Sequence, residues 1–239
     1  MTMNNQRVAI IGGSSGIGLA LAQAAAEQGA EVVIASSSSR RLHDALAQLP
    51  ETSSGQVVDV RREAELAAFF ERLARFDHLA ITAGDALAPQ TIRSVDLDDA
   101  RRALDVRFWG AIAAIKHATG HLTSGGSITL TSGMVAVRPN PDAALASAGA
   151  AAVEGLVRGL AVELAPVRVN AVRPGVVRTP MWDGIGREER EDLFAMLAGR
   201  TMTGSIASAA DASAAYLYLM GNSSVTGTVM TVDNGALLS

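Results

Sequence analysis

Arg7-Val8-Ala9-Ile10-Ile11-Gly12-Gly13-Ser14-Ser15-Gly16-Ile17-Gly18 is the stretch that decides the fold of this chain. A short apolar run, typical of a buried strand, leads into a glycine-rich turn and then into an Ala- and Leu-rich helical pattern. Glycines let the backbone turn tightly and approach a diphosphate closely, and the free N–H groups of the following helix favour negative charge. Many strand-to-helix turns need glycine for geometry alone. The strand–turn–helix context nevertheless favours a dinucleotide-binding unit.

The same alternation of strand and helix continues to the end of the chain. We predict strands at residues 7–11, 31–35, 56–58, 78–82, 127–131, 168–172 and 228–232, and helices at 19–28, 64–74, 97–119, 144–164 and 209–220. Strands that are apolar throughout indicate a parallel sheet covered on both faces. We therefore expect an α/β fold: one Rossmann-type, doubly wound domain over residues 1–239, with a seven-stranded parallel sheet flanked by helices. Residues 176–208 have little regularity, which predicts a lid or binding loop.

Composition narrows the function classes. The 239 residues suit one large α/β domain, and the absence of cysteine excludes disulfides and thiolate chemistry. A formal net charge of −4 gives no electrostatic reason to bind nucleic acid or an anionic membrane. We see no signal-peptide layout, no apolar stretch approaching the ~20 residues that span a bilayer, and no metal site. We expect a soluble, cytoplasmic protein.

The end of the second predicted strand indicates which nicotinamide cofactor is bound. NAD-binding proteins usually place a carboxylate there for the ribose hydroxyls, but residues 32–43 contain no acid. The chain reads Ser36-Ser37-Ser38-Ser39-Arg40-Arg41, and hydroxyl and guanidinium groups suit a 2′-phosphate. We therefore expect NADP, with NAD less favoured and Ser36, Ser37, Ser38 and Arg40 as contacts. In the alternative interpretation, Ser39 caps a helix and the two arginines are solvated.

Further motifs follow the later strands in order. They are Asp59-Val60, Thr82-Ala83-Gly84, Pro174-Gly175-Val176-Val177-Arg178-Thr179 and Asp233-Asn234-Gly235. Together with the glycine spacing of the first turn, this series resembles the short-chain dehydrogenase/reductase family along essentially the whole chain. The resemblance implies that the cofactor is bound by Gly12, Ser14, Ser15, Gly16, Ile17, Gly18, Asp59, Val60, Thr82, Ala83, Gly84, Pro174, Gly175, Val177 and Thr179. The backbone of Val177 and the hydroxyl of Thr179 would hold the nicotinamide carboxamide.

The catalytic positions implied by the resemblance depart from the family pattern. Ser132 falls on the catalytic serine, whereas Arg107 stands where the family has an asparagine. The tyrosine and lysine positions fall on Ala146 and Ala150. The only tyrosines are Tyr216 and Tyr218 and the only lysine is Lys116, all in other segments. The alternatives are that Ser132 satisfies loop backbone groups and that Arg107 is a surface residue.

Two functions fit these residues. The first is an NADP(H)-dependent oxidoreductase in which Ser132 and Arg107 act on a carbonyl or alcohol and water supplies the proton. The second is a catalytically silent NADP(H)-binding protein, such as a redox sensor, scaffold or inactive subunit. None of His78, His117 and His121 makes a convincing substitute acid.

The resemblance also implies the substrate surface and the assembly. Met134, Leu145, Met181 and Trp182 would line an apolar pocket beside Ser132, which suggests a largely apolar substrate. A homotetramer is expected through helices 97–119 and 144–164, whose small residues Ala111, Ala114, Gly155 and Gly159 would allow close approach.

Overall fold

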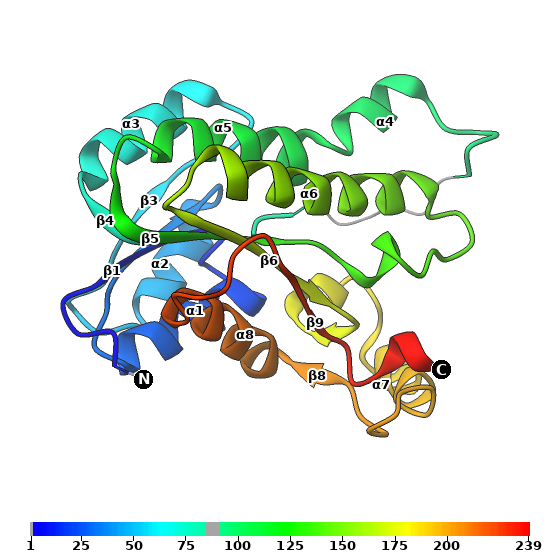
Figure 1. Cartoon of the computed structure of the whole chain (residues 1–239). Coiled ribbons are helices and arrows are strands. Elements are labelled where there is room, and N and C mark those ends of the chain that lie inside the picture. The colour runs from blue at the N-terminus through cyan, green and yellow to red at the C-terminus, as the bar shows by residue number, and fades with distance from the viewer. Residues whose placement is uncertain (1, 85–90) are drawn as a thin grey trace.

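A seven-stranded sheet forms the centre of the molecule (Figure 1). The computed structural model describes residues 2–84 and 91–239. The strands lie in the order β3-β2-β1-β4-β5-β6-β9, and every neighbouring pair is parallel. Their bounds are β1 Arg7–Ile11, β2 Glu31–Ser36, β3 Ser54–Val57, β4 Phe76–Ile81, β5 Leu122–Thr131, β6 Arg168–Pro174 and β9 Val229–Val232. All seven predicted strands are confirmed, and the strand order reverses between β1 and β4, where doubly wound sheets bind ligands.

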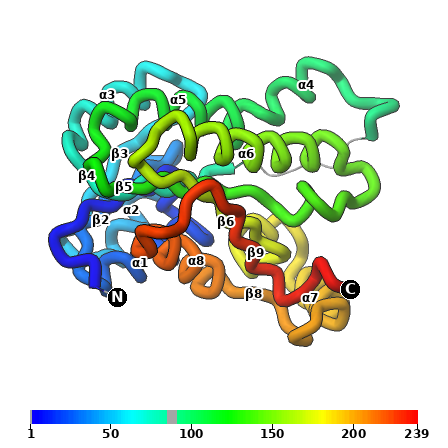
Figure 2. Tube along the Cα trace, in the orientation of Figure 1, coloured from blue at the N-terminus to red at the C-terminus, as the bar shows by residue number. Residues whose placement is uncertain are grey.

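Helices cover both faces of the sheet (Figures 1 and 2). One face carries α1 (Gly16–Glu27), α2 (Ser39–Leu46) and α8 (Ala209–Gly221), and the other carries α3 (Glu63–Leu73), α5 (Ala111–Ala118) and α6 (Ala144–Glu163). Successive residues of a strand point to opposite faces. Val8 and Ile10 therefore enter one core, and Ala9 and Ile11 the other. This two-sided burial explains why a central strand such as β1 is apolar almost throughout.

The helix predicted at residues 97–119 is divided. It consists of α4 (Leu97–Arg102), a π-helical turn η1 (Asp105–Gly110) and α5. Within α5, Ala111 is 1 % and Ala114 0 % exposed, and both pack in the core of their own chain. The prediction that these two alanines form a contact between subunits is therefore wrong.

Residues 176–208 are more regular than predicted. They contain a second, two-stranded parallel sheet, β7 (Val177–Arg178) with β8 (Ala207–Ser208), and the helix α7 (Arg187–Ala198). Phe194 is the only buried residue of α7. The first half of the helix, residues 187–192, is entirely charged, so its apolar stripe is too short for the period to be recognised.

Helix α6 is more apolar than the sequence analysis allowed. By length and composition alone, it is long and apolar enough to cross a membrane. An 18-residue segment of the helix has a mean hydropathy of 1.4, and 28 % of that segment is buried. The expectation that no stretch approaches this length is wrong for α6. Its buried residues, including Val153 and Val157, pack against the sheet, and a core helix satisfies the same test.

Candidate nucleotide and active site

The glycine-rich turn between β1 and α1 is packed too closely for side chains. Gly12 has a φ of +90°, and a Cβ added to it would lie 2.5 Å from the backbone nitrogen of Ala83. A Cβ on Gly18 would overlap the carbonyl oxygen of Gly12. The Thr82 hydroxyl lies 3.1 Å from the carbonyl oxygen of Ile11 and 3.2 Å from that of Gly12, and donates to them. Thr82, at the end of β4, thus holds the turn in place.

The turn also meets the segment predicted to bind the nicotinamide end. Gly16, the first residue of α1, has a φ of +54°, and an added Cβ would lie 3.3 Å from the Cβ of Thr179. Gly175 bonds to the carbonyl of Val232, and its missing side chain leaves room for Asp233. Two motifs separated by about 160 residues in the chain are therefore adjacent. The cradle of small residues fits a dinucleotide diphosphate.

Some of the serines after β2 already form hydrogen bonds within their own loop or with the glycine-rich turn. Ser36 is 5 % exposed, and its hydroxyl accepts from Ser14 Oγ at 2.8 Å and from Ser38 N at 3.2 Å. Ser38 Oγ accepts from Arg41 N and caps α2, so the alternative that Ser39 is the cap is wrong. Ser37 is exposed, and the Arg40 side chain is 92 % exposed, with its Nε 3.8 Å from Asp44. Ser37 and Arg40 are therefore open to solvent, and the long Arg40–Asp44 ion pair would compete only weakly with a phosphate.

Asp59 and Val60 follow β3. The Asp59 carboxylate accepts two bonds from the Arg61 guanidinium, from Nε at 2.9 Å and Nη2 at 2.8 Å. The hydrogen bond from Arg61 lowers the pKa of Asp59. Val60 is 8 % exposed and lies against Gly110, next to the π-helical turn. This loop therefore carries a fixed carboxylate and an apolar residue, which suits the predicted contact with the cofactor.

Arg107 lies over the end of β4. It is half-buried, and its guanidinium packs on Gly84, where a Cβ would overlap Nη2 and lie 2.9 Å from Cζ. The structure thus brings Arg107 to the motif Thr82-Ala83-Gly84, at the same edge of the sheet as the glycine-rich turn. A fixed positive charge at this edge can polarise an oxygen atom of a bound molecule.

Ser132 lies just beyond β5 and is 1 % exposed. Its hydroxyl donates to Glu154 Oε1 at 2.7 Å and lies 3.3 Å from the carbonyl oxygen of Ala150. Ala146, Ala150 and Glu154 are spaced by four residues and share one face of α6. Ala146 and Ala150, the positions predicted to correspond to the family's tyrosine and lysine, thus adjoin a buried carboxylate.

Glu154 and Arg173 were missed by the sequence analysis. Arg173 donates hydrogen bonds to both carboxylate oxygens of Glu154, from Nε to Oε1 at 2.8 Å and from Nη2 to Oε2 at 2.7 Å. Burial raises the pKa of Glu154, but the hydrogen bonds from Arg173 and Ser132 outweigh it and the pKa is lowered. The carboxylate is therefore ionised at neutral pH. A glutamate four residues after Ala150 in an apolar helix was the only available signal.

Of the remaining candidate acids, Tyr216 reaches this edge only as a buried hydroxyl at Thr131, the last residue of β5, and His78 and His117 lie elsewhere. Tyr216 is fully buried on α8, its hydroxyl lies 2.5 Å from Thr131 Oγ1, and burial raises its pKa. His78 bonds to Ser127 at 2.9 Å, and burial lowers its pKa to about 4. His117 pairs with Glu63, on α3. In the described part of the chain, no group of three or more His, Cys, Asp or Glu side chains could hold a metal ion.

A small hollow of about 120 Å³ lies beside the η2 turn (Met134–Ala136). Its apolar lining is Met134, Val176, Leu197, Ile206 and Ala236, joined by polar groups that include Arg138 and Arg200. Met134 was predicted to line the substrate pocket. Leu145, Met181 and Trp182 are not among the lining residues, and Trp182 instead packs on Phe194 and bonds to the carbonyl of Val177.

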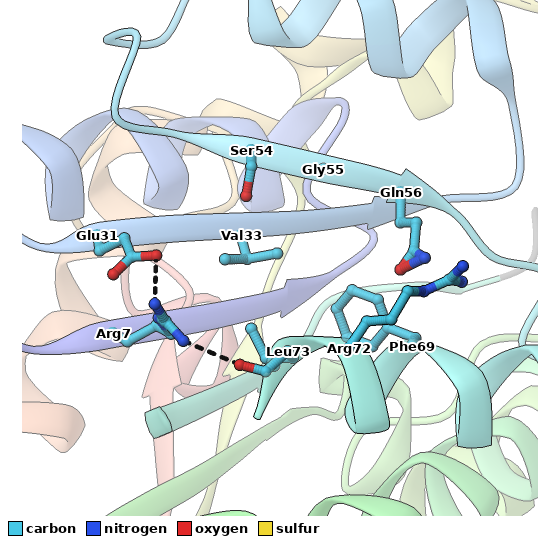
Figure 3. A pocket seen from close by; sticks show the side chains of 9 residues that line it. All are labelled: Arg7, Glu31, Val33, Ser54, Gly55, Gln56, Phe69, Arg72 and Leu73. Atoms are coloured by element: carbon cyan, nitrogen blue, oxygen red, sulfur yellow. Dashed lines mark hydrogen bonds and ion pairs between the residues drawn. The ribbon is translucent and has the colours of Figure 1, made fainter. Parts of the chain in front are cut away.

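A larger hollow of about 380 Å³ lies away from the glycine-rich turn (Figure 3). Its lining includes Arg7 and Glu31, the first residues of β1 and β2, which form an ion pair at 2.8 Å. The glycine-rich turn follows the opposite end of β1. The chemistry described above does not involve this hollow.

The fold and the glycine cradle define a nucleotide-binding protein of the doubly wound parallel class. A family model described as enoyl-(acyl carrier protein) reductase matches residues 11–236. The short-chain dehydrogenase/reductase ucsE of Acremonium sp. is 35 % identical over 99 % of this chain and 97 % of its own. The short-chain dehydrogenase/reductase malC of Malbranchea aurantiaca is 36 % identical over 99 % and 96 %.

Solved structures agree. The MalC reductase/Diels-Alderase of Malbranchea aurantiaca matches with a TM-score of 0.93 and 33 % identity over 99 % of this chain and 98 % of its own. A small-chain dehydrogenase in complex with NADPH matches with a TM-score of 0.82 and 34 % identity over 99 % and 100 %. The chain belongs to the short-chain dehydrogenase/reductase family of oxidoreductases.

Proposed function

We propose that this protein is an NADP(H)-dependent oxidoreductase acting on a carbonyl or alcohol group, with Arg107 and Ser132 at its active site and no tyrosine–lysine pair. The observation that carries the proposal is the position of Arg107, whose guanidinium lies on Gly84 beside the cofactor turn. The hollow at Met134 and Val176 offers apolar surface to a substrate, although its lining, which includes neither Ser132 nor Arg107, also carries polar and charged side chains.

The choice of NADP rests on the loop after β2. Ser37 and Arg40 are exposed there, and residues 32–43 contain no carboxylate to repel a 2′-phosphate. The matching small-chain dehydrogenase is a complex with NADPH, which agrees with this choice. NAD remains the less favoured cofactor.

The chemistry required of the protein is limited. When bound, the nicotinamide supplies or accepts the hydride. Arg107 would polarise the substrate oxygen, but its guanidinium keeps its proton at working pH and cannot act as the acid. Ala146 and Ala150 offer only methyl groups. The proton would therefore come from water or from the substrate itself.

The test is anaerobic NADPH oxidation against a panel of carbonyl compounds. We expect turnover whose pH profile has no alkaline limb from a tyrosine–lysine pair. Arg107→Ala and Ser132→Ala should each lower turnover and leave NADPH affinity comparatively intact. Turnover that neither substitution changes would show that the site is wrongly assigned. If no compound oxidises bound NADPH at any pH, the protein is a silent NADP(H) binder.

We further propose a cytoplasmic homotetramer that uses the outer face of α6. A Cβ added to Gly155 or Gly159 would meet no atom within 4 Å, and Val162 is 82 % exposed. An apolar helix that is only 28 % buried in one subunit favours a symmetric contact that covers it.

A further inference from the structure

The hydrogen bonds of Ser132 leave its hydroxyl with no hydrogen to offer. A serine hydroxyl has one hydrogen and two lone pairs. Two acceptors surround Ser132 Oγ: Glu154 Oε1 at 2.7 Å and the carbonyl oxygen of Ala150 at 3.3 Å. The nearer acceptor is charged, and a charge-assisted bond is the stronger one. A third acceptor, such as a substrate carbonyl oxygen, could not form a hydrogen bond with Ser132 Oγ, because only the lone pairs of that oxygen are left.

The carboxylate that takes this hydrogen is itself fixed. Arg173 binds both oxygens of Glu154, and the Arg173 side chain is 15 % exposed. A third Arg173 nitrogen, Nη1, bonds to Thr231 on β9 at 3.2 Å. The backbone nitrogen of Ser132 bonds to Val172 on β6 at 2.8 Å. Both partners of the Ser132–Glu154 bond are therefore anchored to the sheet, and a rotation of either would leave a buried charge underpaired.

We propose that Glu154 is a positioning residue that makes Ser132 a hydrogen-bond acceptor, so that the ligand group bound at Ser132 is a donor: a hydroxyl or an N–H. This inference rests on the proposed function, in which Ser132 meets the substrate. Arg107 is then the group that meets a bare carbonyl oxygen. Of a carbonyl–alcohol pair, the alcohol is the form that Ser132 recognises.

The first test locates the hydrogen directly. A neutron structure of the deuterated NADP⁺ complex should show the Ser132 deuterium on the line to Glu154. A deuterium directed away from both Glu154 and Ala150 would overturn the proposal. This measurement does not depend on turnover, so it stays decisive if the proposed oxidoreductase function fails.

The second test compares two ligands that cannot react in the forms used, cyclohexanol with the NADPH complex and cyclohexanone with the NADP⁺ complex. Ser132→Ala should weaken cyclohexanol about fivefold, as expected for one hydrogen bond, and leave cyclohexanone unchanged. Glu154→Gln keeps the shape and replaces the charged acceptor of the serine hydrogen by a neutral amide oxygen, which holds that hydrogen less firmly. It should therefore weaken cyclohexanol and tighten cyclohexanone.

The control separates this role from a structural one. If Glu154 acts through Ser132, Glu154→Gln should have no further effect on either ligand in the Ser132→Ala background. Glu163→Gln, on the exposed part of the same helix, should change neither the dissociation constant of cyclohexanol nor that of cyclohexanone. Weaker cyclohexanone binding in Ser132→Ala would show that Ser132 donates and would refute the proposal. If neither ligand binds, the neutron structure alone decides whether Ser132 donates its hydrogen to Glu154.

Discussion

Replacing Gly84 by alanine tests whether Arg107 acts where the structure places it. The new Cβ would overlap Arg107 Nη2 and lie 2.9 Å from Cζ, well inside ordinary contact distance, so the guanidinium must move by about 1 Å. The φ of Gly84 is outside the left-handed region, so alanine adds no backbone strain. Because the obstructing atoms are at the end of a flexible side chain, we expect a loss of unfolding free energy below ~1 kcal/mol.

The expected loss of activity is much larger. A hydrogen bond to a charged group contributes about 1.5–3 kcal/mol, and misplacing it in the transition state should lower kcat roughly 10- to 100-fold. The assay is NADPH oxidation with the best carbonyl compound of the panel, alongside thermal unfolding and the dissociation constant for NADPH. Gly120→Ala, where a Cβ meets no atom within 4 Å, is the matched control.

Two outcomes would refute this reasoning. Gly84→Ala with unchanged kcat would mean that the position of Arg107 does not matter. A similar loss from Gly84→Ala in the Arg107→Ala background would mean that alanine acts on the cofactor, through the predicted contact of Gly84, and not through the arginine.

Three further predictions concern the cofactor, stability and assembly. Arg40→Ala should weaken NADPH more than NADH in calorimetry, because the exposed guanidinium would meet only the 2′-phosphate; equal losses would contradict this. His78 has a pKa lowered to about 4 by burial, so the unfolded chain takes up its proton first as the pH falls. Denaturant unfolding should therefore show up to about 3 kcal/mol of stability that is complete above pH 6.5 and lost towards pH 4, and His78→Gln should remove that dependence. Light scattering at micromolar concentration should give the mass of a tetramer, and a monomer would count against the contact through α6.

The elements predicted well are those whose sequence pattern reflects burial. The central strands of the sheet are largely apolar because both of their faces are covered, and a run such as residues 7–11 shows this directly. Helix α7 is charged throughout its first half, residues 187–192, and fully buries only Phe194, so its sequence carries little of such a pattern. The two-residue strands β7 and β8 are too short for any periodicity.

The place of the candidate site residues in the fold was predictable, but their hydrogen bonding was not. The motifs placed Ser132 and Arg107 near the cofactor edge of the sheet, because parallel strands end together there. Which acceptor takes the hydrogen of Ser132 depends on Glu154, 22 residues away in sequence, and on Arg173, 19 residues further. The same limit applies to Ser36, whose hydroxyl is used by Ser14 and Ser38. Such pairings arise only when distant segments meet.

The direction in which the Arg107 side chain points depends on the number of residues in the π-helical turn at Asp105–Gly110. A π-turn holds one residue more than an α-turn, and each residue of an α-helix turns the chain by about 100°. Deleting one residue between Arg107 and α5 would let the helix run on as a regular α-helix, and Arg107 would swing by about that angle away from Gly84. Substitutions around the turn leave this count unchanged. Surface helices usually accommodate insertions and deletions at their ends. Here, an insertion or deletion in the turn would move the Arg107 guanidinium away from Gly84 or back to it, although the residue itself stays an arginine.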